Sequence, residues 1–243
     1  MPTETIEPAS EDALAFNEDA YKTHGLAAQR SYPNEELCRF MGRNYFPLSK
    51  PSRAATRILE LGCGTGANLW MMAAEGFDAY GIDFSPSAIE LARQNLGARG
   101  LTARLDVADM TRLPYEGLMF DAVIEVFSSY AIDTASFRRT VAEVRRVLKP
   151  GGRFFAYTPG KGSDAWHDFA PADKLDDNTL RELTRPTAPF APYPGPFRFM
   201  SHQELADELA QHGLTVEYAE SLTRTYRQGQ EVFEFLVIEA RSI

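Results

Sequence analysis

Apolar residues recur at two different spacings along the chain. Between residues 13 and 46 they follow a helical spacing, and Leu37, Phe40 and Met41 form an i, i+3, i+4 set. From Arg57 onward, short apolar runs alternate with helical segments, which is typical of a parallel sheet with crossover helices. The pattern predicts helices that precede a larger α/β domain.

Short apolar runs predict the parallel strands of this domain. They are residues 58–61, 79–82, 103–105, 120–126 and 153–158. Helical segments separate most of them. One helix is expected to begin at Ser85-Pro86, because a serine side chain caps free N–H groups and proline has no N–H to lose.

A helix and two further strands are predicted near the C-terminus. Ser201 and Glu204 form a capping box, in which each side chain satisfies a free N–H group at a helix start, and Gly213 ends the helix. Residues 214–218 and 232–240 indicate strands, and strands with no helix between them pair antiparallel. We therefore predict a Rossmann-like, seven-stranded, mostly parallel sheet with a C-terminal antiparallel hairpin and helices on both faces.

The alternation of strands and helices stops between residues 159 and 200. This stretch contains seven prolines and the aromatic residues Trp166, Phe169, Phe190, Tyr193, Phe197 and Phe199. A segment this long inside a compact domain is usually functional. We expect a lid-like insertion on the substrate side, after the fifth strand; a disordered insert is the alternative.

The chain is expected to have three parts. Residues 1–12 are polar, acidic and aperiodic, which predicts a mobile tail. Residues 13–50 predict an N-terminal helical cap. Lys50-Pro51-Ser52 then breaks the helical pattern before the main domain, residues 51–243.

The chain has 243 residues, with 25 Lys and Arg against 34 Asp and Glu, and a formal net charge of −9. This balance disfavours a nucleic-acid partner, since basic side chains supply most of that affinity. Two cysteines are too few for a disulfide framework, and four scattered histidines lack zinc-ligand spacing, so we expect no metal. The acidic start is unlike an export signal, and no apolar run approaches the roughly 20 residues that span a bilayer. We expect a cytoplasmic monomer or homodimer without a membrane partner.

A glycine-rich loop, residues 60–66, follows the first strand and opens a helix. Glycines in this context let a ligand approach the backbone closely. The loop also fits a dinucleotide pattern loosely, with Asp83 about 20 residues further on as a carboxylate for a ribose. Glu60, just before the loop, would repel a pyrophosphate but suits a ligand that carries an ammonium group. The loop therefore favours a cationic ligand.

These residues resemble the class I S-adenosylmethionine-dependent methyltransferases, whose signature E/D-x-G-x-G-x-G is intact at residues 60–66. The resemblance covers about residues 55–160 closely. It extends through four further motifs, at residues 81–85, 108–110, 120–124 and 146–153. It implies S-adenosylmethionine as cofactor and S-adenosylhomocysteine as product.

The resemblance also implies roles for the loop and the segment before it. Gly62, Cys63 and Gly64 would lie against the methionyl and ribose parts of the cofactor, and Glu60 would act on its ammonium group. Tyr21 and Arg30 occupy the segment where similar small-molecule methyltransferases place an arginine for the methionyl carboxylate, which suits a guanidinium fork. A plain surface role for Arg30 is the alternative.

Four residues further along would hold the nucleoside part of the cofactor. Asp83 would accept from both ribose hydroxyls, and Phe84 would pack against the adenine. Asp109 would accept from the adenine amino group while Met110 covers the ring. Asp109 as a turn residue, and Phe84 and Met110 as core residues, are the alternatives.

A sulfonium methyl group is already activated, so its transfer depends largely on positioning and on exclusion of water. A hydroxyl acceptor still benefits from a general base, and the candidates are Glu125, His24 and His167. Glu125 interrupts an apolar strand near its carboxyl end, where parallel sheets bind ligands. A strand-end carboxylate without a catalytic role, and ordinary surface histidines, are the alternatives.

The chain has Val126-Phe127-Ser128-Ser129-Tyr130 where nucleic-acid methyltransferases carry an Asn/Asp-Pro-Pro-aromatic run. This departure, with the aromatics of residues 159–200 and Phe16, Tyr21 and Tyr32, favours a small methyl acceptor in a ring-lined pocket. We expect methyl transfer to an N or O atom of a small molecule. A nicotinamide-dependent oxidoreductase and a catalytically silent S-adenosylmethionine-binding module are the competing hypotheses.

Overall fold

The computed structural model describes residues 11–169 and 173–243. Ten of the predicted tail residues, 1–10, lie outside this part of the chain. The α-helices are α1 (Glu11–His24), α2 (Glu35–Asn44), α3 (Lys50–Ala54), α4 (Leu69–Ala74), α5 (Pro86–Gly97), α6 (Thr134–Val147), α7 (Asp164–His167) and α8 (His202–Gln211). The strands are β1 (Arg57–Leu61), β2 (Asp78–Asp83), β3 (Arg104–Val107), β4 (Phe120–Val126), β5 (Leu148–Gly160), β6 (Thr179–Leu180), β7 (Phe197–Arg198), β8 (Leu214–Tyr226) and β9 (Glu231–Ser242). Short 3-10 turns are η1 (Gly25–Ala28), η2 (Ser129–Ala131) and η4 (Arg227–Gly229).

Seven strands form one sheet in the order β3-β2-β1-β4-β5-β9-β8. The strands β1 to β5 are parallel, whereas β9 runs antiparallel to β5 and β8 antiparallel to β9. The predicted sheet is therefore confirmed, including its C-terminal hairpin. The hairpin is longer than predicted, since β8 pairs with β9 from Leu214 to Tyr226. The outer half of β8 is a largely polar, exposed edge strand, so its sequence lacks the apolar alternation that marks a strand.

Helices cover both faces of the sheet, as predicted. Alternate residues of β1 point to opposite faces, so that Ile58 and Leu59 belong to different apolar clusters. One face is covered by α2 and α4 through Leu37, Phe40, Met41, Leu69 and Met72. The other is covered by α6 and α8 through Phe137, Val141, Val144, Leu205 and Leu209. None of the helices in the described residues is long and apolar enough to cross a membrane.

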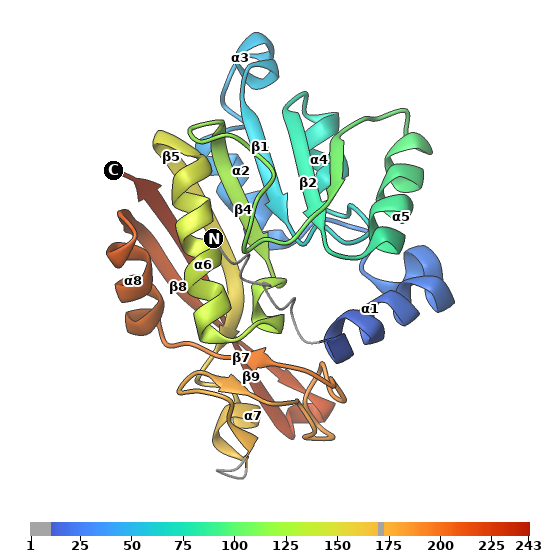
Figure 1. Cartoon of the computed structure of the whole chain (residues 1–243), viewed down its shortest axis with the longest axis vertical. Coiled ribbons are helices and arrows are strands. Elements are labelled where there is room, and N and C mark those ends of the chain that lie inside the picture. Colours follow the sequence, from blue (N-terminus) through green and yellow to red (C-terminus); the bar gives the residue numbers. More distant parts are fainter. Residues whose placement is uncertain (1–10, 170–172) are drawn as a thin grey trace, which may run out of the picture.

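The predicted helical cap divides into two units with different places in the fold. Helix α2 is part of the core, because Leu37, Phe40 and Met41 are fully buried against the sheet. Helix α1 instead lies at the carboxyl end of the parallel strands, as Figure 1 shows. Glu18 of α1 accepts hydrogen bonds from Ser85 and Ser87 at the start of α5. Only α1 and the turn after it are therefore in position to cap a site.

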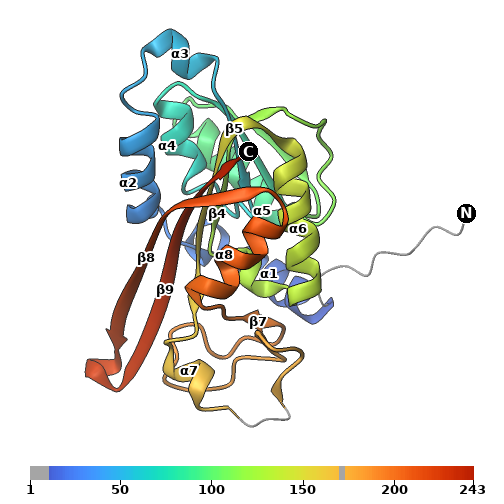
Figure 2. The same ribbon diagram turned by 90° about the vertical axis from the view of Figure 1, so that its left-hand side faces the viewer.

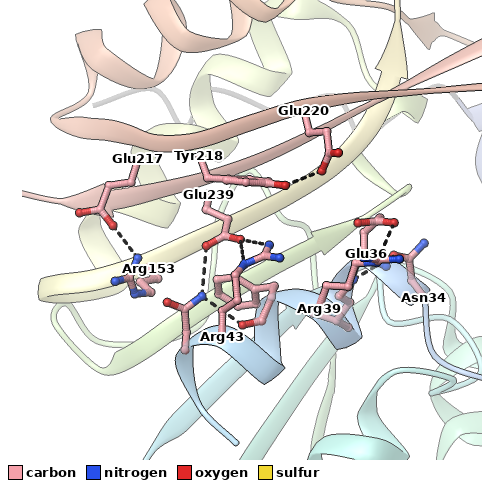
Figure 3. A network of polar contacts seen from close by, with 12 residues as sticks. Asn34, Glu36, Arg39, Arg43, Arg153, Glu217, Tyr218, Glu220 and Glu239 are labelled. Carbon is pink, nitrogen blue, oxygen red and sulfur yellow. Dashed lines mark hydrogen bonds and ion pairs between the residues drawn. The ribbon is translucent and has the colours of Figure 1, made fainter. Parts of the chain in front are cut away.

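A polar network joins α2 to the C-terminal hairpin (Figure 3). The carboxylate of Glu239, on β9, is buried and accepts from Arg43 Nε at 3.1 Å and from Asn44 Nδ2 at 3.1 Å. The Arg43 guanidinium also lies 4.7 Å from the centroid of the Tyr218 ring on β8. These contacts fix the antiparallel extension against the helix that covers the sheet.

The described residues of the insert, 159–169 and 173–200, form a layer at the carboxyl end of the sheet, on the same side as α1 (Figures 1 and 2). The insert contains α7 and the short pair β6 and β7, and it is attached to β9. Val232 N donates to Asp164 Oδ2 at 2.7 Å, and Arg185 Nε donates to Glu231 Oε2 at 2.6 Å. Most of its aromatic side chains are buried, which gives the described part of the insert a packed core of its own.

Candidate functional site

The glycine-rich loop connects β1 to α4 and lies at the carboxyl edge of the sheet. Gly62 has a φ of +61° and Gly64 a φ of +51°, the left-handed region that side chains rarely adopt. A Cβ atom on Gly62 would lie 2.3 Å from Ser128 Cβ. Glycine therefore lets the turn after β4 pack directly on the loop. The Cys63 side chain points away, into the buried cluster beneath the loop, and burial raises the pKa of its thiol.

Glu60, at the end of β1, is a buried carboxylate with one unsatisfied oxygen. Its Oε1 accepts from Asn68 Nδ2 at 2.5 Å, whereas Oε2 has no partner among the described residues. Burial raises the pKa of Glu60 to about 8, while Asn68 and the charge of Arg30 act in the opposite direction. A buried carboxylate with one unsatisfied oxygen is costly, and a cationic group that binds to that oxygen would stabilise it.

Asn68 connects Glu60 to the segment that follows α1. Its Oδ1 accepts from the backbone N–H of Asn34 at 2.9 Å and from Arg30 at 3.4 Å. Arg30 and Glu60 are thus connected through Asn68, to which both are hydrogen-bonded. The sequence reasoning missed Asn68. An amide at the start of an apolar helix is a usable signal, and the structure shows that this one is buried.

Asp83 ends β2 directly beside the glycine loop. Its Oδ2 accepts from Gly64 N at 2.9 Å and its Oδ1 from Ser85 N at 3.0 Å, which fixes the carboxylate plane. Burial raises the pKa of Asp83 to about 6. Asp109 follows β3, and its Oδ1 accepts from Thr111 N at 2.8 Å. Asp109 therefore stabilises a turn, which is the alternative role that the sequence left open for it. It also lines a cavity.

Two adjoining cavities meet at the glycine loop, sharing Gly62, Asp83, Phe84, Met110, Ser128 and Ala131. The first, here called the Asp109 cavity, extends along Ala13, Leu14, Ile82, Ala108, Asp109 and Ile132. The second, the Phe127 cavity, extends along Asn17, Tyr21, Gln29, Phe127 and Tyr130. The structure thus brings together Tyr21, Gly62, Asp83, Phe84, Asp109 and Met110 from the predicted set.

The predicted bases lie elsewhere. Glu125 is fully buried and does not line either cavity; its Oε1 accepts from Ser128 N at 2.6 Å and from Ser129 N at 2.8 Å. It holds the turn after β4. His24, at the end of α1, and His167, at the end of α7, are exposed and line neither cavity. A catalytic role for any of the three stays a prediction.

Arg198, on β7 of the insert, is fully buried against the same turn. It donates to Ile132 O at 3.1 Å and to Ser129 Oγ at 3.0 Å, and its guanidinium lies 3.8 Å from the Phe137 ring centroid. Burial lowers the pKa of Arg198 to about 10, and the charge of Glu125 opposes this shift. No feature of the sequence indicates this role, because the contact depends on how the insert folds back.

Comparison with known proteins agrees with this geometry. Residues 58–152 match the family described as "Methyltransferase domain". A SAM-dependent methyltransferase from Methanosarcina mazei has a structure that superposes with a TM-score of 0.66 at 21% identity, covering 87% of this chain and 99% of the other. Residues 58–152 therefore match a methyltransferase domain, and the chain shares its fold with this methyltransferase.

Curated relatives are similar to this chain over 42% or 76% of its length. Demethylmenaquinone methyltransferase of Thermus thermophilus is 39% identical over 103 residues, which is 42% of this chain and 46% of the relative. The chain therefore aligns with less than half of that protein. The ubiquinone biosynthesis O-methyltransferase of a Methylobacterium species is 27% identical over 187 residues, 76% of this chain and 70% of the relative.

The candidate site contains one further residue that sequence reasoning missed. Gln29 lies on the glycine loop, where its Oε1 accepts from Thr65 N at 3.1 Å and its Nε2 donates to Tyr21 Oη at 2.6 Å. A Cβ on Gly64 would lie 2.0 Å from Gln29 Oε1, so glycine makes this approach possible. Gln29 stands in a polar stretch without periodicity, and only its place in the fold distinguishes it from a surface glutamine.

Proposed function

We propose that this chain transfers the methyl group of S-adenosylmethionine to an N or O atom of a small molecule and releases S-adenosylhomocysteine. The observation that carries the proposal is the buried Glu60, whose Oε2 has no partner among the described residues and which lies at a glycine loop beside two cavities. This carboxylate is complementary to the α-ammonium group of the cofactor. The names of the Thermus and Methylobacterium relatives support a small-molecule acceptor.

The residues around the loop would hold the methionyl end of the cofactor. Glu60 would accept from the ammonium group and Arg30 would donate to the carboxylate, with Asn68 keeping the two charges apart by bonding to both. Cys63 would contribute only its backbone, since its side chain is buried beneath the loop. Gln29 would have to accommodate the cofactor, because its amide lies against Gly64.

The Asp109 cavity would take the nucleoside. Asp83, already oriented by two backbone N–H groups, would accept from the ribose hydroxyls with its remaining lone pairs. Asp109 would accept from the adenine amino group, and Phe84 and Met110 would cover the ring. The cofactor supplies the electrophilic methyl group, which would lie where the two cavities meet.

The Phe127 cavity would hold the methyl acceptor. We propose the cytoplasm as the compartment in which the protein acts. The position of the cavity next to Gly62 and Asp83 lets a bound molecule face the methyl group, so that transfer proceeds by in-line displacement. Glu125 would act indirectly, by fixing the turn that carries Phe127 and Tyr130. Alignment of the two molecules and exclusion of water would supply most of the rate.

Calorimetric titration with S-adenosylmethionine, S-adenosylhomocysteine and NAD tests the proposal. We expect both adenosyl compounds to bind and NAD not to bind. A screen with labelled methyl donor over amines and hydroxyl compounds then tests turnover. Binding without turnover of any acceptor would favour a silent adenosyl-binding module, and selective binding of NAD would overturn the proposal.

A further inference from the structure

Phe127 has an unusual backbone conformation at the edge of the acceptor cavity. It follows β4 with a φ of +55°, in the left-handed region that bulky side chains rarely adopt. Its N–H nevertheless donates to Tyr157 O at 2.8 Å, so the residue remains tied to β5. Strained conformations of this kind persist where the surroundings enforce them, and they concentrate at functional sites. The conformation places Phe127 on the wall of the cavity.

Rings from two distant segments, the insert and β9, enforce this arrangement together with Tyr130. The Phe127 centroid lies 4.4 Å from that of Phe190 in the insert and 5.6 Å from that of Phe235 on β9. Tyr130, the second ring on the cavity wall, lies 4.6 Å from Phe127 and 4.5 Å from Phe197. Because the rings are fixed before a ligand binds, stacking on them costs little conformational entropy. Such a wall favours a flat ring over a saturated one.

Asn17 and Tyr21, which α1 contributes to the cavity, offer hydrogen bonds without a formal charge. Asn17 donates through Nδ2 to Ala13 O at 2.8 Å and to Tyr193 Oη at 3.3 Å, and its Oδ1 has no partner among the described residues. Tyr21 Oη accepts from Gln29, which leaves its own O–H to donate. Burial raises the pKa of Tyr21 well above its usual value, so it stays a neutral phenol. Asn17 and Tyr21 therefore present one acceptor and one donor to the cavity, whereas the charged Asp83, which both cavities share, is assigned to the ribose.

Building on the proposed function, we propose that the methyl acceptor is an uncharged, flat aromatic or heteroaromatic compound with an N–H or O–H nucleophile at its edge. The ring stacks on Phe127 and Tyr130, and the N–H or O–H donates to Asn17 Oδ1. In the transfer, a lone pair of the N or O atom forms the new bond to the methyl carbon. The C–S bond breaks with its electron pair going to sulfur, and the proton of the nucleophile passes to water.

A matched pair of probes tests the preference for a flat ring. With the protein saturated by S-adenosylhomocysteine, calorimetry measures the binding of 2-naphthol and of trans-decahydro-2-naphthol, which has the same carbon skeleton but is saturated. We expect 2-naphthol to bind at least about tenfold more tightly. Phe127→Leu should remove most of this preference, whereas Tyr32→Leu, which changes an exposed ring outside both cavities, should keep it.

The hydrogen-bonding edge is tested with 2-methoxynaphthalene, which lacks the O–H donor. Wild-type protein should prefer 2-naphthol by about fivefold, and Asn17→Leu should abolish that preference. Equal binding of the flat and saturated probes, or no binding of either to the S-adenosylhomocysteine complex, overturns the inference. Failure of S-adenosylhomocysteine itself to bind overturns the proposed function instead, so the two failures are distinguishable.

Discussion

The two cavities are built from different kinds of chain segment. The Asp109 cavity is formed mainly by short runs that each follow one parallel strand, such as Gly62 after β1 and Asp83 at the end of β2. The Phe127 cavity adds α1 and the turn after β4, whose rings pack on the insert and β9. Asn17, which lines it, is hydrogen-bonded to Tyr193 of the insert, 176 positions away. A site made of strand ends follows from local sequence, whereas a site made of distant segments follows from packing.

The two cavities are nevertheless coupled through one turn. Glu125 and Arg198 hold the segment from Ser128 to Ile132, which contributes to both cavities. The insert therefore does more than cover an acceptor, because one of its residues supports the wall of the Asp109 cavity. The following experiments separate the two regions or reveal their coupling.

The largest effect is expected for Arg198→Met. It leaves Ser129 Oγ and Ile132 O without their donor and Glu125 without a nearby cation, in a fully buried place. The free energy of unfolding should fall by about 2–4 kcal/mol in urea titrations. Arg93→Met is the control, since Arg93 is exposed and makes a surface ion pair with Glu90 and a hydrogen bond to Leu105 O. Equal stability of both variants would show that Arg198 does not hold the turn.

Asp83→Ala should act chiefly on cofactor binding, although Asp83 lines both cavities. The loss of charge-assisted bonds to the ribose should weaken S-adenosylhomocysteine binding by about 1–3 kcal/mol in calorimetry. Asp207→Ala, at an exposed position on α8, should bind normally. A folded Asp83→Ala protein with unchanged affinity would remove this carboxylate from the cofactor site.

Glu60 should make cofactor binding depend on pH. Its pKa of about 8 in the free protein exceeds the ordinary value of 4.5, so the folded state holds this proton more tightly than the unfolded chain does. Its contribution to stability therefore falls as the pH rises between these values. The ammonium group binds the ionised form, so affinity for S-adenosylhomocysteine should rise about tenfold between about pH 6.5 and 8.

Glu60→Gln provides the comparison for this pH dependence. The variant should bind S-adenosylhomocysteine more weakly and with a much flatter pH profile, while any contribution of Asp83, whose pKa is raised to about 6, remains in both proteins. Parallel profiles for wild type and variant would mean that Glu60 does not face the ammonium group.

The smallest effects are expected for the two histidines. His24 and His167 are exposed and line neither cavity, so His24→Ala and His167→Ala should each keep kcat within about twofold once an acceptor is known. A larger loss of kcat at unchanged cofactor affinity would show that the corresponding segment closes over the acceptor during turnover.

Much of the fold was predictable because its signals are local. The capping box at Ser201 and Glu204 and the cap at Ser85 are present as predicted, since each depends on residues within one helical turn. The outer part of β8 was not predictable, because an exposed edge strand is held by pairing with β9 rather than by its own apolar pattern. The division of residues 13–50 into a core helix and a capping helix also depended on tertiary packing.

The sequence by itself determined the parallel sheet with its glycine loop and the carboxylate of Asp83 at a strand end. The backbone geometry of a parallel sheet is the same wherever it forms, so it fixes where a loop needs glycine and where a strand-end carboxylate meets a ligand. In this chain, Gly62 lies against Ser128 and Asp83 ends a strand. Only the tertiary structure decided that Gln29 lies on the loop, that Glu125 holds a turn, and that Arg198 supports it. These contacts join segments far apart in the chain, and their partners are selected by burial and shape, which leave no spacing in the sequence.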